Sequence, residues 1–267
     1  MRVNNSKETV RIFDAHAHLQ DLRFGSAAMD VIQRASAAGV SNISCCGTGE
    51  NDWYIVAEIA KKHECITPSF GIHPWYVHER SEKWQKTLAG YLAEFPCSGV
   101  GEVGLDGRKN REHLAEQLEC LDAQMEIAVS LNRPISLHCL GCWEPLVELL
   151  RKFSRRNLKF MVHSYSGSAE LVKIICGLGG YLSFSASITH RNRKKAISAL
   201  TAVPLDRLLI ESDAPDLPPA STAPDTVNEP SFILETVKAA SFYLDISFEE
   251  LCKITFDNGQ RFFKGES

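Results

Sequence analysis

The sequence predicts a single-domain (β/α)8 barrel of the TIM type, and three observations lead to this fold class. The chain has 267 residues, a length that suits one large domain with a sizeable core. Short β-rich runs alternate with helical runs eight times, which is the number and order of elements in this barrel. No glycine-rich phosphate loop follows the first β-rich run, which disfavours the alternative, a doubly wound open sheet.

The predicted strands are short runs rich in Val, Ile, Leu and Phe, as expected of strands that are buried on both faces. We expect them at residues 10–15, 42–46, 66–71, 98–103, 134–138, 159–163, 180–185 and 207–211. Stretches long enough for a crossover helix separate neighbouring strands, so a parallel sheet is expected.

The stretches between the strands carry apolar residues at helical spacing. We expect helices at residues 27–38, 51–63, 81–95, 111–131, 144–154, 168–178, 191–202 and 230–244. Gly39 follows the first of them and is a typical helix stop. A last helix is expected over residues 247–264, because Ser247 and Glu250 have the spacing of a capping box.

The composition is that of a soluble globular protein, with 44% hydrophobic and 23% charged residues. This excludes a disordered, fibrous or collagen-like chain. Lys and Arg number 29 against 33 Asp and Glu, whereas a protein that coats nucleic acid is usually basic. No segment reaches the roughly 18 uninterrupted apolar residues of a membrane span, so none is expected.

The nine cysteines are scattered and odd in number, which favours a reducing compartment over a disulfide framework. Residues 1–11 are polar and lack the apolar core of a secretory signal, and residues 1–9 are expected to be flexible. We therefore expect a monomer in the cytoplasm, with the nucleus as the alternative. Cys139 and Cys142 are either a redox or zinc C-x-x-C pair or incidental, and the absence of a supporting context favours the second interpretation.

Side chains of metal-ligand type stand at five of the predicted strand ends, where a barrel collects its chemistry. They are His16, His18, Glu102, His138, His163 and Asp213. His16 and His18 are two residues apart on an extended chain and therefore point to the same side. Glu102 is a charge in an apolar, glycine-flanked strand, which is rare unless it is paired or binds metal. We interpret the six residues as a metal centre.

The number of ligands favours two divalent ions, because one catalytic zinc ion usually takes three protein ligands. A carboxylate such as Glu102 can bridge such a pair. Two divalent ions with Glu102, Asp213 and neutral imidazoles leave the shell positive, which favours an anionic substrate or hydroxide. Ligands of these types accept Mg, Mn or Zn, so the metal is not specified by the sequence.

Several short strings occur in a characteristic order between Phe13 and Phe263. The main ones are FDAHAHL at 13–19, GIHPW at 71–75, GEVGLD at 101–106, HSYSG at 163–167, ESDAP at 211–215 and DNGQRFF at 257–263. With these motifs the chain resembles the TatD family of metal-dependent hydrolases, a branch of the amidohydrolase-like barrels. The resemblance covers nearly the whole chain.

The resemblance implies a TIM barrel with a divalent-metal centre and nuclease activity towards DNA. It implies that the two histidines of the first strand bind one ion and that His138 and His163 bind the other. Glu102 would bridge the ions. Asp213 would bind metal and orient or deprotonate the attacking water, so Asp213 and Glu102 are the expected catalytic residues.

Three further residues are expected to bind the substrate. His73 in GIHPW corresponds to a family histidine at the wall of the site, where it either contacts the scissile phosphate or packs before Pro74. Leu140 stands where family members commonly carry Arg, the natural bidentate partner of phosphate. Arg108 and Lys109 are expected to contact phosphate instead, and the alternative is a solvated turn.

The sequence thus predicts a hydrolase that uses two divalent ions to cleave phosphodiester bonds in single-stranded DNA or frayed DNA ends, with RNA as an alternative substrate. Hydrolysis of esters, amides or lactones is the alternative within enzymes, since related barrels use the same metal shell on carbonyls. A metal-binding protein without turnover is the alternative outside enzymes. It would be expected to have lost a ligand, and no ligand is missing.

Overall fold

Eight parallel strands form the centre of the protein in a computed structural model, which describes residues 10–265. The strands pair in chain order from β1 to β8. Their bounds are β1 Ile12–Ala17, β2 Val40–Cys46, β3 Ile66–Phe70, β4 Gly99–Asp106, β5 Ile135–Leu140, β6 Phe160–Val162, β7 Tyr181–Phe184 and β8 Leu208–Ile210. Each strand pairs with the next in parallel, which requires the crossover helices between them.

The barrel closes between its first and last strands. Directly after β8, the backbone N–H of Asp213 donates to the carbonyl of His16 over 3.0 Å, and the carbonyl of Ala214 accepts from the N–H of His18 over 2.7 Å. These bonds join the two edges at the carboxyl ends of the strands. The predicted (β/α)8 barrel is therefore confirmed.

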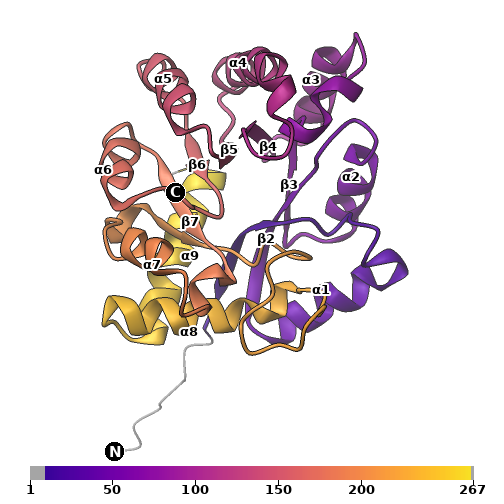
Figure 1. Ribbon diagram of the computed structural model, residues 1–267. Helices are drawn as coiled ribbons and strands as arrows, with labels where there is room; N and C mark the ends of the chain where they lie inside the picture. The colour runs from indigo at the N-terminus through magenta and orange to yellow at the C-terminus, as the bar shows by residue number, and fades with distance from the viewer. Residues whose placement is uncertain (1–9, 266–267) are drawn as a thin grey trace, which may run out of the picture.

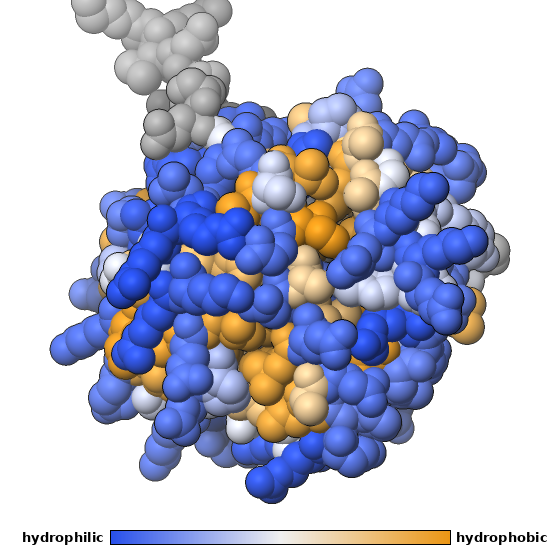
Figure 2. Space-filling view, turned by 90° about the horizontal axis from the view of Figure 1, so that it is seen from above, coloured by the Kyte–Doolittle hydropathy of each residue, from blue (hydrophilic) through white to orange (hydrophobic). Residues whose placement is uncertain are grey.

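Helices α1 to α8 are arranged around the barrel, and α9 lies behind the strands in the view of Figure 1. Their bounds are α1 Ala28–Ala37, α2 Trp53–Lys62, α3 Trp84–Glu94, α4 Leu114–Ser130, α5 Trp143–Ser154, α6 Ala169–Gly177, α7 Lys194–Leu200, α8 Ile233–Leu244 and α9 Phe248–Lys264. Hydrophilic side chains cover most of the helical face seen in Figure 2, and apolar side chains show in strips between them. This is the pattern of amphipathic helices that turn their apolar stripes towards a sheet.

The last helix, α9, packs against β1 and β8, the two strands at which the sheet closes. Its aromatic side chains meet those of the strands: the rings of Phe13 and Phe263 stack with centroids 5.2 Å apart. Phe256 and Phe262 belong to the same buried cluster. Of the expected capping box, the structure has the N-cap bond, in which Ser247 Oγ accepts from the N–H of Glu250 over 3.1 Å.

The ends of several elements differ from the predicted bounds, for a physical reason. Strand β1 ends at Ala17 and β4 continues to Asp106, so that His16 and Asp106 lie within strands. The change from apolar to polar residues predicts the end of a strand. Here the strand continues past that change, because the polar residues are buried and have polar partners in the barrel. In α4 the predicted start is instead a 3-10 turn, Arg111–His113, and α7 begins at Lys194.

Two sequence-based expectations concern membranes and the chain end. Within residues 10–265, no helix has both the length and the apolar character to cross a membrane. The segment 1–9, predicted to be flexible, lies outside the described residues.

Gly104 in β4 allows β4 and β5 to approach each other beside the site. It lies opposite His138 at φ 150°, and a Cβ there would collide with the backbone carbonyl of His138. We expect Gly104→Ala to lower the free energy of unfolding by about 1–3 kcal/mol, the usual cost of overpacking. Thermal unfolding followed by circular dichroism measures this loss.

The matched control is Gly90→Ala on α3, where a Cβ would meet no atom within 4 Å. This exchange should leave the melting temperature unchanged or raise it, because alanine favours a helix. Equal melting temperatures for the two variants would contradict the steric argument.

Candidate metal centre

The six predicted ligand side chains lie together at the carboxyl ends of the strands. His16 and His18 come from the end of β1, Glu102 from β4, His138 from β5, and His163 and Asp213 follow β6 and β8. Five of them are buried, and His138 is partly exposed. We call these six residues the central cluster. A buried group of this polarity needs partners of opposite charge.

Glu102 occupies the middle of the central cluster. Its Oε2 lies 3.4 Å from Nε2 of His16 and 3.2 Å from Nε2 of His18. Its Oε1 lies 3.0 Å from Nδ1 of His138 and 2.7 Å from Nε2 of His163. Each carboxylate oxygen therefore faces its own pair of histidines.

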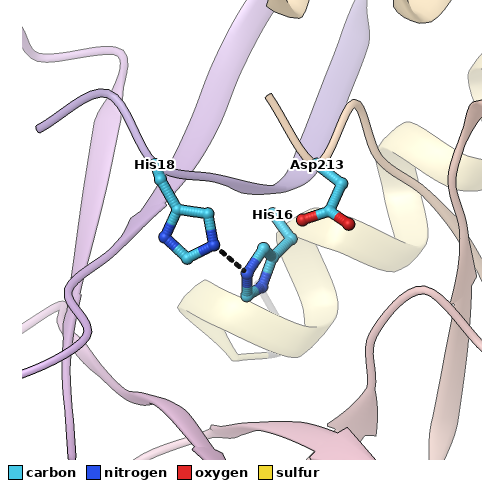
Figure 3. Close-up of side chains that lie close together, drawn as sticks. All are labelled: His16, His18 and Asp213. Carbon is cyan, nitrogen blue, oxygen red and sulfur yellow. Dashed lines mark hydrogen bonds between the residues drawn. The ribbon is translucent and has the colours of Figure 1, made fainter. Parts of the chain in front are cut away.

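Asp213 lies on the side of the first pair, as Figure 3 shows with His16 and His18. The ligand atoms of these three side chains are within 4.8 Å of one another. The backbone of Asp213 has φ 56°, a left-handed conformation that aspartate tolerates better than most residues. Its N–H bond to the His16 carbonyl fixes this turn at the closing point of the barrel.

Each predicted ligand histidine has one ring nitrogen that faces Glu102 and an outer one that points away from it. The hydrogen-bond partner of the outer nitrogen indicates which of the two carries the hydrogen. His18 Nδ1 donates to the carbonyl of Cys46 over 2.8 Å, which leaves the lone pair of its neutral ring on Nε2, towards Glu102. Hydrogen-bond acceptors also lie beside the outer nitrogens of His16 and His138. The inner nitrogens are close together: His16 Nε2 and His18 Nε2 are 3.2 Å apart, and His138 Nδ1 and His163 Nε2 are 3.4 Å apart.

Inward lone pairs repel each other and the Glu102 carboxylate unless a cation lies among them. Imidazole nitrogen and carboxylate oxygen together suit divalent ions such as zinc or manganese. The residues present therefore fit a metal centre. Four overlapping groups of three side chains in this region have ligand atoms close enough to share an ion.

His73 differs from the four ligand histidines. Its Nε2 lies 3.3 Å from Oε1 of Glu102, but its Nδ1 accepts the backbone N–H of Trp75 over 3.1 Å. A neutral ring that accepts at Nδ1 carries its hydrogen on Nε2. Although the distances alone would allow His73 to share an ion with Glu102 and His138, this hydrogen points into the site and makes His73 a donor.

The charges of the central cluster depend on one another. Burial raises the pKa of Glu102, but the surrounding histidines outweigh it and hold the pKa well below its usual value. Burial lowers the pKa of His16 to about 4. Burial also opposes the charge of His18, yet Glu102 and Asp213 raise the pKa of His18 to about 9. Burial raises the pKa of Asp213 to about 7. Despite burial, Glu102 also holds the pKa of His163 well above its usual value. Without a metal ion, protons on His18 and His163 balance the charge of Glu102, and metal binding at these nitrogens would release them.

The predicted substrate-binding residues after β4 lie outside the central cluster. Arg108 and Lys109 are exposed, and their backbone N–H groups donate to Asp106 Oδ1 over 2.8 and 2.9 Å. The Lys109 ammonium lies 3.4 Å from the centre of the Trp75 ring. Leu140 pairs with Asp106 in the sheet. The loop is therefore fixed next to the histidines while its cationic side chains face solvent.

Cys139 and Cys142 are free and buried in the hydrophobic core. Burial raises the pKa of both thiols, which disfavours the reactive thiolate form. Their surroundings support the interpretation that they are packing residues.

Two acidic residues outside the predicted set contact the predicted ligand histidines. Asp106 Oδ2 lies 3.3 Å from Nε2 of His138, and Glu211 Oε1 lies 3.4 Å from Nδ1 of His163. Both carboxylates are fully buried. An acidic residue within or directly after an apolar strand was the available signal, as it was for Glu102.

Known proteins are similar to this chain over nearly its whole length. The sequence model of the TatD-related DNase family matches residues 13–264. The uncharacterized metal-dependent hydrolase YabD of Bacillus subtilis is 30% identical over 256 residues, which cover 95% of this chain and 99% of that protein. The 3'-5' ssDNA/RNA exonuclease TatD of Erwinia tasmaniensis is 28% identical over 258 residues, covering 94% and 99% of the two chains.

A solved structure supports the fold. The TatD homologue YJJV of Escherichia coli K12 superposes with a TM-score of 0.90 at 24% identity, covering 96% of this chain and 99% of that one. The family match extends over nearly the whole barrel and includes every residue of the central cluster. The chain therefore belongs to the TatD-related DNase family of metal-dependent hydrolases.

Proposed function

We propose that the protein is a two-metal phosphodiesterase that degrades single-stranded DNA or frayed DNA ends, with RNA as a second substrate. The observation that carries this proposal is the placement of Glu102, whose two oxygens face two separate pairs of histidines. Glu102 would be shared by two ions held by these histidine pairs, and such a pair of ions would supply the charge that stabilises the attacking and leaving oxygens of a phosphate displacement.

In this proposal the central cluster divides into two metal positions. His16, His18 and Asp213 hold the first ion, and His138 and His163 hold the second, with Glu102 shared between them. Divalent cations of the magnesium, manganese or zinc type would supply the Lewis acidity that activates water and polarises a phosphoryl oxygen. The neutral imidazoles leave the positive charge of such ions largely uncompensated, which favours an anionic substrate.

Asp213 is the proposed general base. Its carboxylate is buried beside the first histidine pair, a position from which it can accept a proton from the attacking water. His73 is the proposed hydrogen-bond donor to a phosphoryl oxygen, because its Nε2 hydrogen points towards Glu102. Burial lowers the pKa of His73 to about 4, which keeps this donor neutral.

The nucleic-acid substrate is supported by two observations. A relative that spans nearly the whole chain is named as a 3'-5' ssDNA/RNA exonuclease. The exposed cations Arg108 and Lys109 follow the strand that carries Glu102 and can contact phosphates outside the metal positions. We also propose that the protein acts as a monomer in the cytoplasm, where its nine free cysteines would stay reduced.

The substrate class can be tested by initial rates on single-stranded and duplex oligonucleotides of DNA and RNA, beside a panel of esters and lactones. We expect single-stranded DNA to be cleaved fastest, with a shallow salt dependence because few phosphates are neutralised away from the metals. The double variant Arg108→Ala, Lys109→Ala should raise KM more than it lowers kcat, since these groups only hold the substrate. Faster turnover of a neutral ester would instead favour carbonyl hydrolysis.

His73→Gln tests the assignment of His73 as a donor. Because no ion depends on it in this proposal, metal content should match the wild type while kcat falls by about 10–100-fold, in the lower range of a lost catalytic hydrogen bond. His138→Ala is the comparison variant, and it should lose an ion. Loss of an ion from His73→Gln would show that His73 is a ligand.

A further inference from the structure

The outer partners of the ligand histidines differ between the two pairs. In the first pair they are uncharged: His16 Nδ1 lies 3.1 Å from Ser136 Oγ and 3.4 Å from Cys46 Sγ. His18 Nδ1 donates to the carbonyl of Cys46. In the second pair both are carboxylates, Asp106 beside His138 and Glu211 beside His163.

Asp106 is fixed by its neighbours and is not available as a direct ligand. Its Oδ1 accepts the backbone N–H groups of Arg108 and Lys109, and its Oδ2 accepts Trp75 Nε1–H over 2.8 Å. The remaining approach to Oδ2 is taken by His138 Nε2 at 3.3 Å. Asp106 can therefore accept a hydrogen bond from Nε2–H of His138, which leaves the inner nitrogen Nδ1 with a lone pair.

Glu211 is fixed in the same manner. Its Oε1 accepts the backbone N–H of Ser164 over 2.7 Å, and its Oε2 accepts the hydroxyl of Ser183 in a short hydrogen bond. His163 Nδ1 is buried and has no partner with good hydrogen-bond geometry, and Glu211 Oε1 lies 3.4 Å from it. A small shift of the ring towards Glu211 would give this nitrogen its acceptor.

The direct anionic ligands are unevenly distributed as well. In the proposed division, the first position has the Asp213 carboxylate in addition to one oxygen of Glu102, although Asp213 also lies within 4.8 Å of ligand atoms of His163 and Glu211. The second position has the other oxygen of Glu102 and two imidazoles. The direct ligands of an ion at the second position would therefore carry less negative charge than those of an ion at the first.

We propose that Asp106 and Glu211 are positioning residues that enable the second histidine pair to hold its ion. They orient His138 and His163, and they supply through the imidazoles the negative charge that Asp213 supplies directly at the first position. This inference rests on the proposed two-metal function. It predicts that neutralising either outer carboxylate lowers the affinity for the second ion and leaves the affinity for the first unchanged.

Asp106→Asn is the sharper variant. The amide oxygen can still accept the backbone N–H groups of Arg108 and Lys109, so the turn is kept. The amide NH2 can no longer accept Trp75 Nε1–H. It also faces His138 Nε2 as a donor and moves the ring hydrogen to Nδ1, which points at Glu102. The lone pair needed for the second ion is lost.

The test is a titration of the metal-free full-length protein with Mn²⁺, followed by equilibrium dialysis and electron paramagnetic resonance. The wild type should bind two ions and show the spectrum of a spin-coupled pair. Asp106→Asn and Glu211→Gln should keep the first ion and bind the second about 10–100-fold more weakly, with an uncoupled spectrum. Asp52→Asn is the matched control, because Asp52 accepts the N–H groups of Thr48 and Gly49 in a comparable turn and should bind like the wild type.

Circular dichroism establishes which variants are folded, and either outer carboxylate alone carries the test if the other variant does not fold. Two ions bound at wild-type affinity, or equal weakening of both ions, would overturn the positioning role. A wild-type protein that binds only one ion would contradict the two-metal proposal itself, which separates the two failures.

Discussion

Asp213→Asn is expected to keep the fold and at least one ion while losing turnover by about 10²–10⁴-fold or more, the range of general acid–base help. The amide has nearly the shape of the carboxylate, and the backbone bond to His16 that fixes this turn is unchanged. The second ion should remain, because its ligands lie on the other side of Glu102. Single-turnover rates on a single-stranded oligonucleotide, with metal analysis of the same sample, measure both quantities.

The matched control is Asp216→Asn in the same loop. Asp216 pairs with Arg23 over 2.8 Å at the surface, and an exposed pair of this kind contributes about 0–1 kcal/mol. We expect this variant to have wild-type turnover and metal content. Near-normal turnover of Asp213→Asn with normal metal content would contradict the role of Asp213 as base.

Glu102→Gln is expected to lose both ions. Each oxygen of Glu102 faces one histidine pair, so that the exchange removes an anionic ligand from both metal positions at once. Outer partners of ligand histidines already change metal affinity by about 10–100-fold, so the loss of a shared direct ligand should exceed about 100-fold for each ion. Turnover should fall to the level of the chelated wild type. Dialysis against Mn²⁺ measures the two affinities.

Glu126→Gln on α4 is the control for the loss of one negative charge, since Glu126 is exposed and pairs with Arg156. It should bind both ions like the wild type. If Glu102→Gln lost only one ion, Glu102 would belong to a single metal position, and the bridging arrangement would be wrong.

Much of the central cluster could be predicted because its residues break a local pattern. Glu102 is a charge in an apolar strand, and His16 and His18 have the two-residue spacing of a strand face. Parallel strands in a barrel bring all such ends to one face whatever their distance along the chain. The fold and the convergence of the six side chains thus depend on periodicity, which the sequence contains.

The second layer of the site could not be predicted, because it depends on side-chain directions. Asp106 is as apparent in the sequence as Glu102, yet only the structure shows that it accepts from Trp75 on one side and approaches His138 on the other. The difference between His73 and the ligand histidines rests on one backbone N–H, that of Trp75. Neither contact follows from spacing along the chain.

The closing bonds between the first and last strands have a consequence for how the protein acquires its metal. The carboxylate of Asp14 accepts the N–H of Ser212 over 2.8 Å across 198 positions of sequence. The residues proposed for the first metal position lie on both sides of this closure, His16 and His18 at the end of β1 and Asp213 after β8. A nascent chain that still lacks β8 therefore has the two histidines without the aspartate. An ion held by these residues would link the first and last strands, and its binding free energy would then contribute to the folding free energy. Metal binding at this position would accordingly require the closed barrel. A chain truncated before β8 would lack the stabilisation that such an ion contributes.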